Sequence, residues 1–327
     1  MMKRREFIVG SMAAAWPVVA RAQQGAMPVI GLLISFSIDQ NSQLLLAAFR
    51  DGLKETGYEE GRNAAIEYIS AEGHYDRLPA LAADLVRRRV TVIAAVGGSP
   101  AAAAAKLATT SIPIVFQVGV DPVRDGLVSS MNRPGGNMTG VSNLAVQIGP
   151  KRLQLLHELL PATTVVAVLI NPARSGGEAE SSELQAVART LGIQLHIQHA
   201  STDHDLDTVF ASLAERRVGG ILISGDPFFN SRNQKIAALA LRHSVPAVYQ
   251  FREFATAGGL ISYGSSQTDM YRLAGAYTGR ILKGEKPADL PIQQSTKAEL
   301  IINLKTAKTL GISVPTALLV RADEVLE

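Results

Sequence analysis

The 327-residue sequence contains no cysteine, and this absence removes several classes of protein at once. Without thiols the chain has no disulfide scaffold, no thiolate zinc site, no cysteine nucleophile and no lipidated N-terminal cysteine. The length corresponds to roughly two domains at about 150 residues each, which is enough to bury a large core. With 47% hydrophobic and 19% charged residues, the composition is that of an ordinary globular protein.

The sequence also lacks a basic domain, although its formal net charge is +3. The excess lies in residues 1–22, which contain four cations (Lys3, Arg4, Arg5 and Arg21) and one anion (Glu6). Removing these five residues from 32 basic and 29 acidic residues leaves 28 of each. A neutral remainder gives no support for binding to a phosphate backbone, and we expect no nucleic-acid partner.

Motifs of the common nucleotide-binding and hydrolytic sites are missing as well. The chain has no Gly-x-Gly-x-x-Gly and no Gly-x-Ser-x-Gly, and residues 279–284 do not form a phosphate loop because Lys-Ser/Thr does not follow. His196, His199 and His204 cluster in the sequence, and we interpret them as part of a solvated loop in preference to a metal site. We therefore expect no catalytic activity, no cofactor and no metal.

The first 22 residues have the three-part layout of a secretory signal. A charged start, Lys3-Arg4-Arg5, precedes the apolar run 7–19, and Ala20-Arg21-Ala22 has the small-x-small pattern of a cleavage site. Arg4-Arg5 also matches a twin-arginine export motif. The alternative is a basic tail ahead of a short buried helix. We expect cleavage after Ala22 and a periplasmic mature chain without membrane insertion, because no later run reaches about 18 apolar residues.

Short runs rich in Val and Ile alternate with longer segments of helical periodicity. Most of the short runs lack polar alternation, which is typical of parallel strands covered by helices on both faces. The predicted strands are 29–35, 64–69, 91–96, 114–117, 165–170, 193–197, 220–224, 247–249 and 260–263. The predicted helices are 43–55, 75–88, 100–108, 151–160, 178–191, 203–216, 231–242 and 268–283. This alternation predicts two doubly wound α/β sheets.

Two breaks in the alternation suggest where the chain passes between the sheets. Residues 132–137 (Asn-Arg-Pro-Gly-Gly-Asn) cannot continue a helix or a central strand, and an extended segment, 139–143, follows. Residues 263–266 leave a strand and enter a helix that the second sheet does not need. We predict one lobe from residues 28–140 and 265–290 and another from 141–264 and 291–327, with crossing strands between them and a ligand cleft where they meet.

Ligands of open α/β sheets bind beyond the carboxyl ends of the strands, so the residues there are the candidate site. Gly97-Gly98-Ser99-Pro100 follows one strand and starts an Ala-rich helix. Glycine permits close approach of a ligand to the backbone, Ser99 can cap the helix, and the free amides of a helix start favour a carboxylate. The alternative is a tight turn with an ordinary serine cap.

Two strand ends resemble each other because each is followed by Asp-Pro, at Asp121 and at Asp226. One lies in each predicted lobe, so the two carboxylates can hold a ligand ammonium group or connect the lobes. The alternative is that each aspartate only starts a turn. Phe228 follows Asp226 directly and is a candidate to stack on a ligand. Other strand ends complete the predicted lining: Ser35, Gln117, Asn171, Tyr249 and Tyr263.

From residue 28 to its end, the chain resembles the solute-binding proteins of ABC importers, in the family that includes binders of tryptophan and other aromatic amino acids. The segments that carry this resemblance are 47–53 (AAFRDGL), 71–79 (AEGHYDRLP), 97–101 (GGSPA), 120–123 (VDPV), 133–141 (RPGGNMTGV), 226–231 (DPFFNS) and 281–287 (ILKGEKP). The resemblance implies a periplasmic binding protein type I-like fold, in which two lobes close on a small solute.

By position, Ser99 resembles the family's hydroxyl residue after the glycine turn, and Asp121 and Asp226 resemble its cleft acids. We therefore expect the amides near Gly98 and Ser99 to bind a carboxylate, and Asp226 or Asp121 to bind an ammonium group. Phe228, Tyr249 or Tyr263 would contact the ligand side chain. The expected partner is a membrane permease, and the protein itself is expected to be a monomer. There are two alternatives. One is a ligand-binding protein that feeds a membrane sensor or chemoreceptor, and the other is an exported α/β enzyme with one of the aspartates as base.

Overall fold

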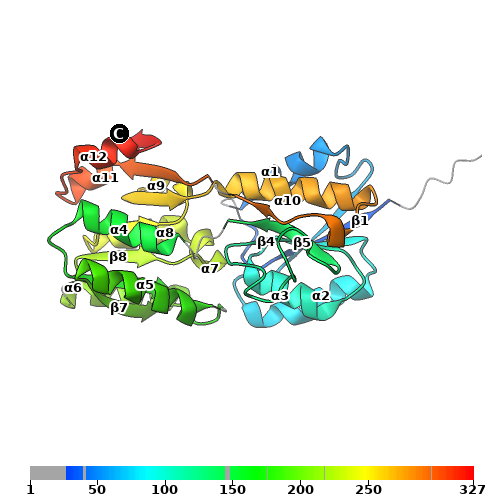
Figure 1. Ribbon diagram of the computed structural model, residues 1–327, viewed down its shortest axis with the longest axis horizontal. Helices are drawn as coiled ribbons and strands as arrows, with labels where there is room; N and C mark the ends of the chain where they lie inside the picture. Colours follow the sequence, from blue (N-terminus) through cyan, green and yellow to red (C-terminus); the bar gives the residue numbers. More distant parts are fainter. Residues whose placement is uncertain (1–26, 40–41, 144–147, 175, 217, 296) are drawn as a thin grey trace, which may run out of the picture.

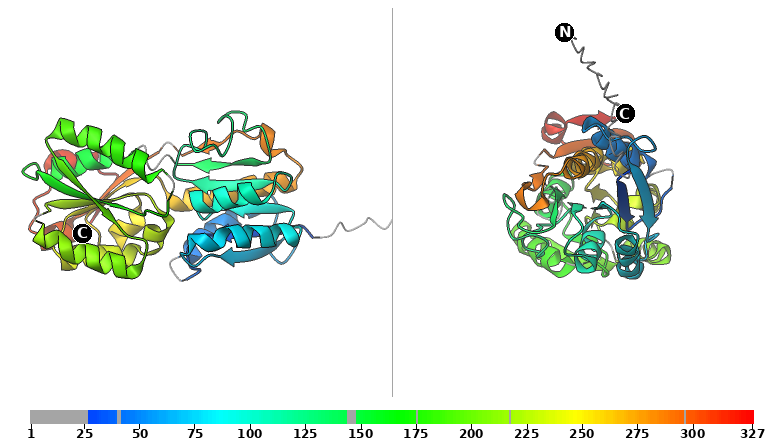
Figure 2. Two further views of the ribbon diagram at one scale, coloured as in Figure 1. Left: turned by 90° about the horizontal axis from the view of Figure 1, so that it is seen from below. Right: turned by 90° about the vertical axis from the view of Figure 1, so that its right-hand side faces the viewer.

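The computed structural model describes residues 27–39, 42–143, 148–174, 176–216, 218–295 and 297–327. Two α/β lobes lie side by side along the long axis of the molecule (Figure 1 and Figure 2). Each lobe is built on one sheet, of six strands in the first and seven in the second. The predicted architecture of two doubly wound α/β lobes is confirmed.

The first sheet is parallel throughout the described strands. Its order is β11-β5-β4-β3-β1-β2, with bounds Gln293–Gln294, Met138–Ser142, Ile114–Val118, Val92–Ala95, Val29–Ile34 and Ala65–Ser70. Helices α1 (Gln43–Glu55) and α10 (Gln267–Leu282) pack on one face, and α2 (Leu78–Arg87) and α3 (Ser99–Ala108) pack on the other. All residues of β3 and β4 are buried, which explains why these strands show no polar alternation.

The second sheet differs by having one antiparallel pair, β10 with β12. Its order is β13-β12-β10-β9-β8-β6-β7, with bounds Glu324–Leu326, Glu299–Asn303, Ile261–Gly264, Ala247–Tyr249, Gly220–Ile223, Val165–Ile170 and Gln194–His199. The core on one face includes α4 (Gly149–Leu159), α5 (Gly177–Leu191), α11 (Leu304–Thr309) and α12 (Thr316–Arg321). The core on the other includes α6 (Asp203–Glu215), α8 (Asn233–Arg242) and α9 (Arg252–Thr256).

Some elements differ from the sequence prediction. The predicted helix 75–88 begins as the 3-10 turn η1 (Tyr75–Arg77) before α2, and the segment after β8 forms a short helix, α7 (Pro227–Ser231), where a loop was expected. A second 3-10 turn, η2 (Pro287–Asp289), precedes β11. The C-terminal elements β12, β13, α11 and α12 were not predicted, because their short polar-flanked runs do not have the periodicity of the longer elements.

The chain passes between the lobes three times. These passages lie between β5 and α4, between Gly264 and Gln267, and between β11 and β12. The predicted division at residues 140–141 falls within β5. Strand β11 pairs with β5 in the first sheet, whereas residues 291–327 were assigned to the second lobe.

The predicted export signal, residues 1–22, lies outside the described residues. Within the part of the chain that the structure describes, no helix combines the length and the apolar character needed to cross a membrane.

Helices α1 and α10 lie against each other through glycines, although more than 200 residues separate them in the sequence. A Cβ atom added to Gly52 would lie 1.7 Å from the carbonyl oxygen of Arg272, and one added to Gly275 would lie 1.9 Å from that of Phe49. The backbones of the two helices therefore approach more closely than any side chain allows. This contact attaches α10, which follows the second passage, to the first lobe.

Gly275→Ala is expected to lower the free energy of unfolding by at least about 2 kcal/mol, because the new methyl group meets helix backbone that cannot move aside. Gly149→Ala is the control, since its Cβ would meet Leu184 at an ordinary 3.5 Å. Thermal melts of both variants test the expectation. Equal melting temperatures would contradict the close packing of α1 on α10.

Candidate functional site

A cavity of about 40 Å³ lies where the two lobes meet. Its walls come from the ends of β3 and β4 in the first lobe, from the segment after β8 in the second, and from α10. Four of the ten predicted site residues line it: Gly98, Ser99, Gln117 and Asp226. Charged side chains of the second lobe and amide side chains of both lobes are therefore close together at the carboxyl ends of the strands, as expected for an open α/β sheet.

The turn between β3 and α3 brings backbone amides to the cavity. Gly98 has φ +80°, a conformation that favours glycine, and it precedes the first helical residue, Ser99. Ser99 does not cap the helix as the sequence suggested, because Gly98 occupies the N-cap position and no side chain caps α3. Ser35 is buried and donates its hydroxyl to the carbonyl oxygen of Gly97, so Ser35 supports the turn from behind.

Asp226 is fully buried at the opposite wall of the cavity, where it caps α7. Its Oδ1 accepts hydrogen bonds from Asn171 Nδ2 (3.0 Å), Tyr75 Oη (3.0 Å) and the backbone amide of Phe228 (2.9 Å). Its Oδ2 is buried and has no hydrogen-bond partner among the described residues. A buried carboxylate oxygen without a donor is costly, so Oδ2 is suited to a ligand that brings a donor.

Burial raises the pKa of Asp226, and the bonds from Asn171, Tyr75 and Phe228 oppose this, as does the positive charge of Arg174. Arg174 also lines the cavity, and it forms a buried ion pair with Glu180 of α5. Burial raises the pKa of Glu180, while Arg174 and the buried Arg152 lower it. Two cations and two anions thus form one buried group beside the cavity, with no net formal charge when all four are ionised.

Tyr75 connects the lobes at this acid. It belongs to η1 of the first lobe, and its hydroxyl donates to Asp226 and accepts from the amide of Phe228 at 3.1 Å, both in the second lobe. Burial raises the pKa of Tyr75, and the charge of Asp226 adds to this effect. A second contact between the lobes is the exposed ion pair of Arg124 with Glu183, at 2.8 Å. The hydroxyl of Tyr75 therefore fixes Asp226 only when the lobes are together.

Tyr75→Phe is expected to weaken solute binding about 10-fold, because the closed form loses a hydrogen bond to a charged group. The loss should appear mainly as faster dissociation in stopped-flow measurements. Tyr68→Phe is the matched control, since Tyr68 donates to Glu60 within the first lobe at 2.9 Å, away from the cavity. An unchanged dissociation rate for Tyr75→Phe would show that this contact does not hold the lobes together.

The remaining polar residues of the prediction have different positions. Gln117 lines the cavity and its Nε2 lies 3.6 Å from the sulfur of Met270. Asn171 is buried behind Asp226, to which it donates. Asp121 lies outside the cavity walls, and its Oδ1 accepts from the amides of Val123 (2.9 Å) and Arg124 (3.2 Å). Asp121 thus makes the contacts of a turn-starting aspartate.

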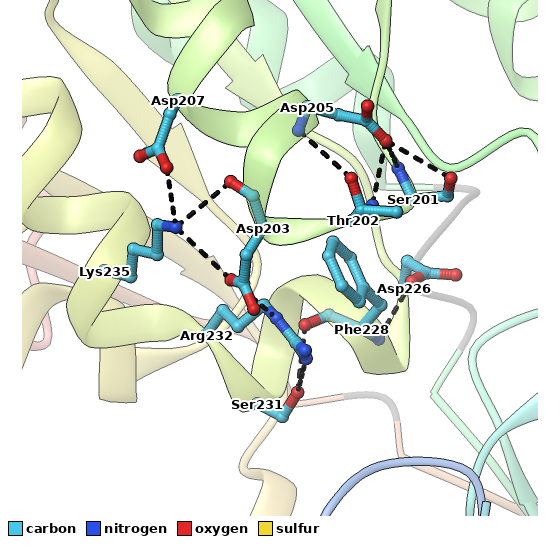
Figure 3. Close-up of polar contacts among 10 residues, drawn as sticks. All are labelled: Ser201, Thr202, Asp203, Asp205, Asp207, Asp226, Phe228, Ser231, Arg232 and Lys235. Atoms are coloured by element: carbon cyan, nitrogen blue, oxygen red, sulfur yellow. Dashed lines mark hydrogen bonds and ion pairs between the residues drawn. The ribbon is translucent and has the colours of Figure 1, made fainter. Parts of the chain in front are cut away.

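The three predicted aromatic residues do not line the cavity. The ring of Phe228 lies under Arg232, whose guanidinium carbon is 4.0 Å from the ring centroid (Figure 3). Tyr249 is fully buried and stacks on Phe254 with ring centroids 4.7 Å apart. Tyr263 is half-buried against the core of the second lobe. Arg232 also forms an ion pair with Asp203, with 3.0 Å between Nε and Oδ1, and this pair holds the guanidinium group over the ring of Phe228.

The cavity contains residues that strand-end reasoning missed. The principal ones are Phe36, Asn143, Arg174, Asn230, Gln267 and Tyr271. Asn230 belongs to the Asp-Pro-Phe-Phe-Asn segment, so its position shortly after Asp226 could have identified it as a cavity residue. Gln267 and Tyr271 lie on α10, and Tyr271 donates to the carbonyl oxygen of Val96 at 2.6 Å. The sequence predicted that this helix belongs to the first lobe, but nothing local in it shows that Gln267 and Tyr271 lie beside the glycine turn.

A metal site is not evident in this arrangement. Within the described ranges, no three His, Asp or Glu side chains are placed to hold an ion together. The cavity is instead lined by one acidic side chain (Asp226), one cationic side chain (Arg174) and several side-chain amides. This combination suits a small polar solute.

Comparison with known proteins points to one family. A family model described as ABC transporter substrate binding protein matches residues 34–326. A tyrosine-binding protein of Clostridioides difficile (strain R20291) is 26% identical over 265 residues, which is 81% of this chain and 75% of the relative.

Solved structures show the same fold. A conserved domain protein from Vibrio cholerae O1 biovar El Tor is 27% identical with a TM-score of 0.83, over 91% of this chain and 99% of that one. The ABC domain from Streptococcus pneumoniae in complex with L-Trp is 24% identical with a TM-score of 0.81, over the same shares. The predicted periplasmic binding protein type I-like fold is confirmed.

Proposed function

The chain belongs to the family of ABC transporter substrate-binding proteins, and on that premise we propose that it captures an α-amino acid or a related carboxylate by closing its two lobes. The family match covers residues 34–326 and confirms a binding role in place of catalysis. The known ligands of two relatives, tyrosine and L-Trp, favour an amino acid with an aromatic side chain.

The observation that carries the proposal is the unpartnered Oδ2 of Asp226 at the cavity wall. An ammonium group supplies the donor that this buried oxygen lacks, and the hydrogen bond is strengthened by the opposite charge of the carboxylate. The amides at the start of α3, beyond Gly98, lie across the cavity and favour a carboxylate. An acid on one wall and amides on the other match the two ends of a zwitterion.

Closure follows from the contacts between the lobes. Tyr75 reaches Asp226, and Gly98 lies against Pro227, so these contacts exist only when the lobes are together. A solute that touches both walls has more contacts in the closed form, and its binding shifts the population toward that form. The lobes must move apart to admit it, because the cavity is only about 40 Å³.

The remaining parts of the proposal concern the export, the location and the partner of the protein. The twin-arginine signal, its cleavage after Ala22 and the periplasmic location rest on residues 1–22 of the sequence. A membrane permease would recognise the closed form and receive the solute, and the protein would act as a monomer.

A thermal-shift screen tests the proposed function directly. The protein is unfolded and refolded to remove any carried solute, and then melted with aromatic and aliphatic amino acids, aromatic carboxylates, amides and sugars. A ligand at about 100 times its dissociation constant should add about 2.7 kcal/mol, which raises the melting temperature by several degrees. A shift with sugars or uncharged amides alone would contradict the assigned roles of Asp226 and the α3 amides.

A further inference from the structure

A second cavity of about 30 Å³ adjoins the first one between the lobes. The two cavities share Phe36, Asn230 and Gln267 in their walls. Phe36 follows β1 in the first lobe, Asn230 lies on α7 in the second, and Gln267 begins α10 where the chain crosses. The second cavity is therefore the space that neighbours the part of a solute held at Asp226.

Three apolar residues and one ionisable residue line the second cavity together with five neutral polar side chains, those of Ser42, Asn230, Ser231, Asn233 and Gln267. Phe36, Leu44 and Leu45 supply apolar surface from the first lobe. Glu253, on α9 of the second lobe, is the single charged residue among the described residues that line it. A cavity with an apolar patch on one side and an acid on the other suits a side chain that is apolar along its length and polar at its tip.

Glu253 has one oxygen that the protein leaves unused. Its Oε2 is buried and has no hydrogen-bond partner among the described residues. The neighbouring Arg252 is paired with Glu324 at 2.7 Å. Burial raises the pKa of Glu253, and its own backbone amide and Arg252 oppose this effect. Glu253 thus repeats, in the second cavity, the feature that makes Asp226 a binding group in the first.

We propose that the second cavity receives the side chain of the bound amino acid and that Oε2 of Glu253 accepts a hydrogen bond from its tip. The inference rests on the proposed function and specifies the solute further. It selects α-amino acids whose apolar side chain ends in a donor, such as a phenol, an indole N–H or an ammonium group. The same amino acid without that donor leaves Oε2 buried and unpaired, and such sites discriminate strongly against it.

Three matched pairs of ligands test the inference by isothermal titration calorimetry of the refolded protein. The pairs are L-tyrosine with L-phenylalanine, L-tryptophan with 3-benzothienyl-L-alanine, and L-lysine with L-norleucine. In at least one pair the donor-bearing member should bind 10-fold or more tightly, as expected for a hydrogen bond to a charged group. The pair that shows this preference identifies the donor.

Glu253→Leu removes the acceptor and should reduce the preference to less than about twofold while binding of the donor-free member is retained. Glu55→Leu is the control, because Glu55 is an exposed acid on α1 paired with Arg272. If Glu253→Leu does not fold, Glu253→Gln replaces it. The neutral amide should lower the preference at least about threefold, since bonds to charged acceptors are roughly twice as strong.

Equal binding within all three pairs would overturn the inference and leave the proposed function intact, and so would a preference that survives in Glu253→Leu. If none of the six amino acids binds the refolded wild-type protein, the inference fails, and the thermal-shift screen then decides separately whether the proposed function fails with it.

Discussion

Asp226→Asn is expected to weaken amino-acid binding by at least about 100-fold. The asparagine retains an oxygen in the place of Oδ1, so the bonds from Asn171, Tyr75 and Phe228 can persist. In the place of Oδ2 it puts an NH₂ group, which cannot accept from a ligand ammonium. Leaving one member of a buried charged pair without its partner costs about 3–5 kcal/mol, which corresponds to more than a hundredfold in affinity.

Asp121→Asn is the control for this change. Both acids follow a strand and precede a proline, but Asp121 accepts only from the amides of its own turn. Titration calorimetry should give near wild-type affinity for Asp121→Asn, and thermal melts should show that both variants are folded. Equal affinities for the two variants would show that the ammonium group of the solute does not bind Asp226, and would contradict the proposed orientation of the solute.

Gly98→Ala is expected to weaken binding by about 10- to 100-fold because it obstructs closure. The added Cβ would lie 2.6 Å from Cγ of Pro227, which belongs to the other lobe. Overpacking of this kind costs about 1–3 kcal/mol, and here the cost arises only when the lobes are together. Small-angle X-ray scattering should show a smaller decrease in the radius of gyration on addition of ligand than in the wild-type protein.

Gly126→Ala separates this clash from backbone strain. Gly126 also has positive φ, +67°, and lies in the same lobe, but nothing lies within 4 Å of its added Cβ. An alanine in the left-handed helical conformation costs about 1–2 kcal/mol of stability. Gly98, with ψ −168°, lies in a region restricted almost to glycine, so its alanine variant is expected to lose more stability, whether or not the lobes are together. Only Gly98→Ala should lose affinity, and a similar loss in Gly126→Ala would mean that general destabilisation is responsible.

The sequence was sufficient to predict most of the fold because the strands are short, apolar and fully covered. β6 and β9 have the predicted bounds, and helix α1 has them as well. The short helix α7 was missed because its five residues are too few for a periodic pattern, and its start depends on the capping carboxylate of Asp226. The C-terminal strand β12 was missed because it is stabilised by antiparallel pairing with β10, which is a tertiary contact.

The candidate site was harder to predict than the fold. Strand ends identified Gly98, Ser99, Gln117 and Asp226, since parallel strands bring their carboxyl ends to one edge. The direction of each side chain is not encoded locally, which is why Tyr249 was expected in the cavity although it stacks on Phe254 inside the second lobe. Tyr75, Arg174 and Gln267 approach the cavity through packing between distant segments. Tyr75 lies in the family segment 71–79, but nothing in that segment shows that its hydroxyl meets Asp226.

The order in which the chain passes between the lobes affects how the protein is made. When the ribosome has synthesised the last residue of β10, Gly264, all strands of the first sheet except β11 exist, but α10 does not. The nascent first lobe then exposes the apolar face of α1, including Phe49, that α10 later covers. Because both lobes need residues after Gly264, neither can complete its fold before those residues have been synthesised, and we expect the two lobes to mature together late in synthesis.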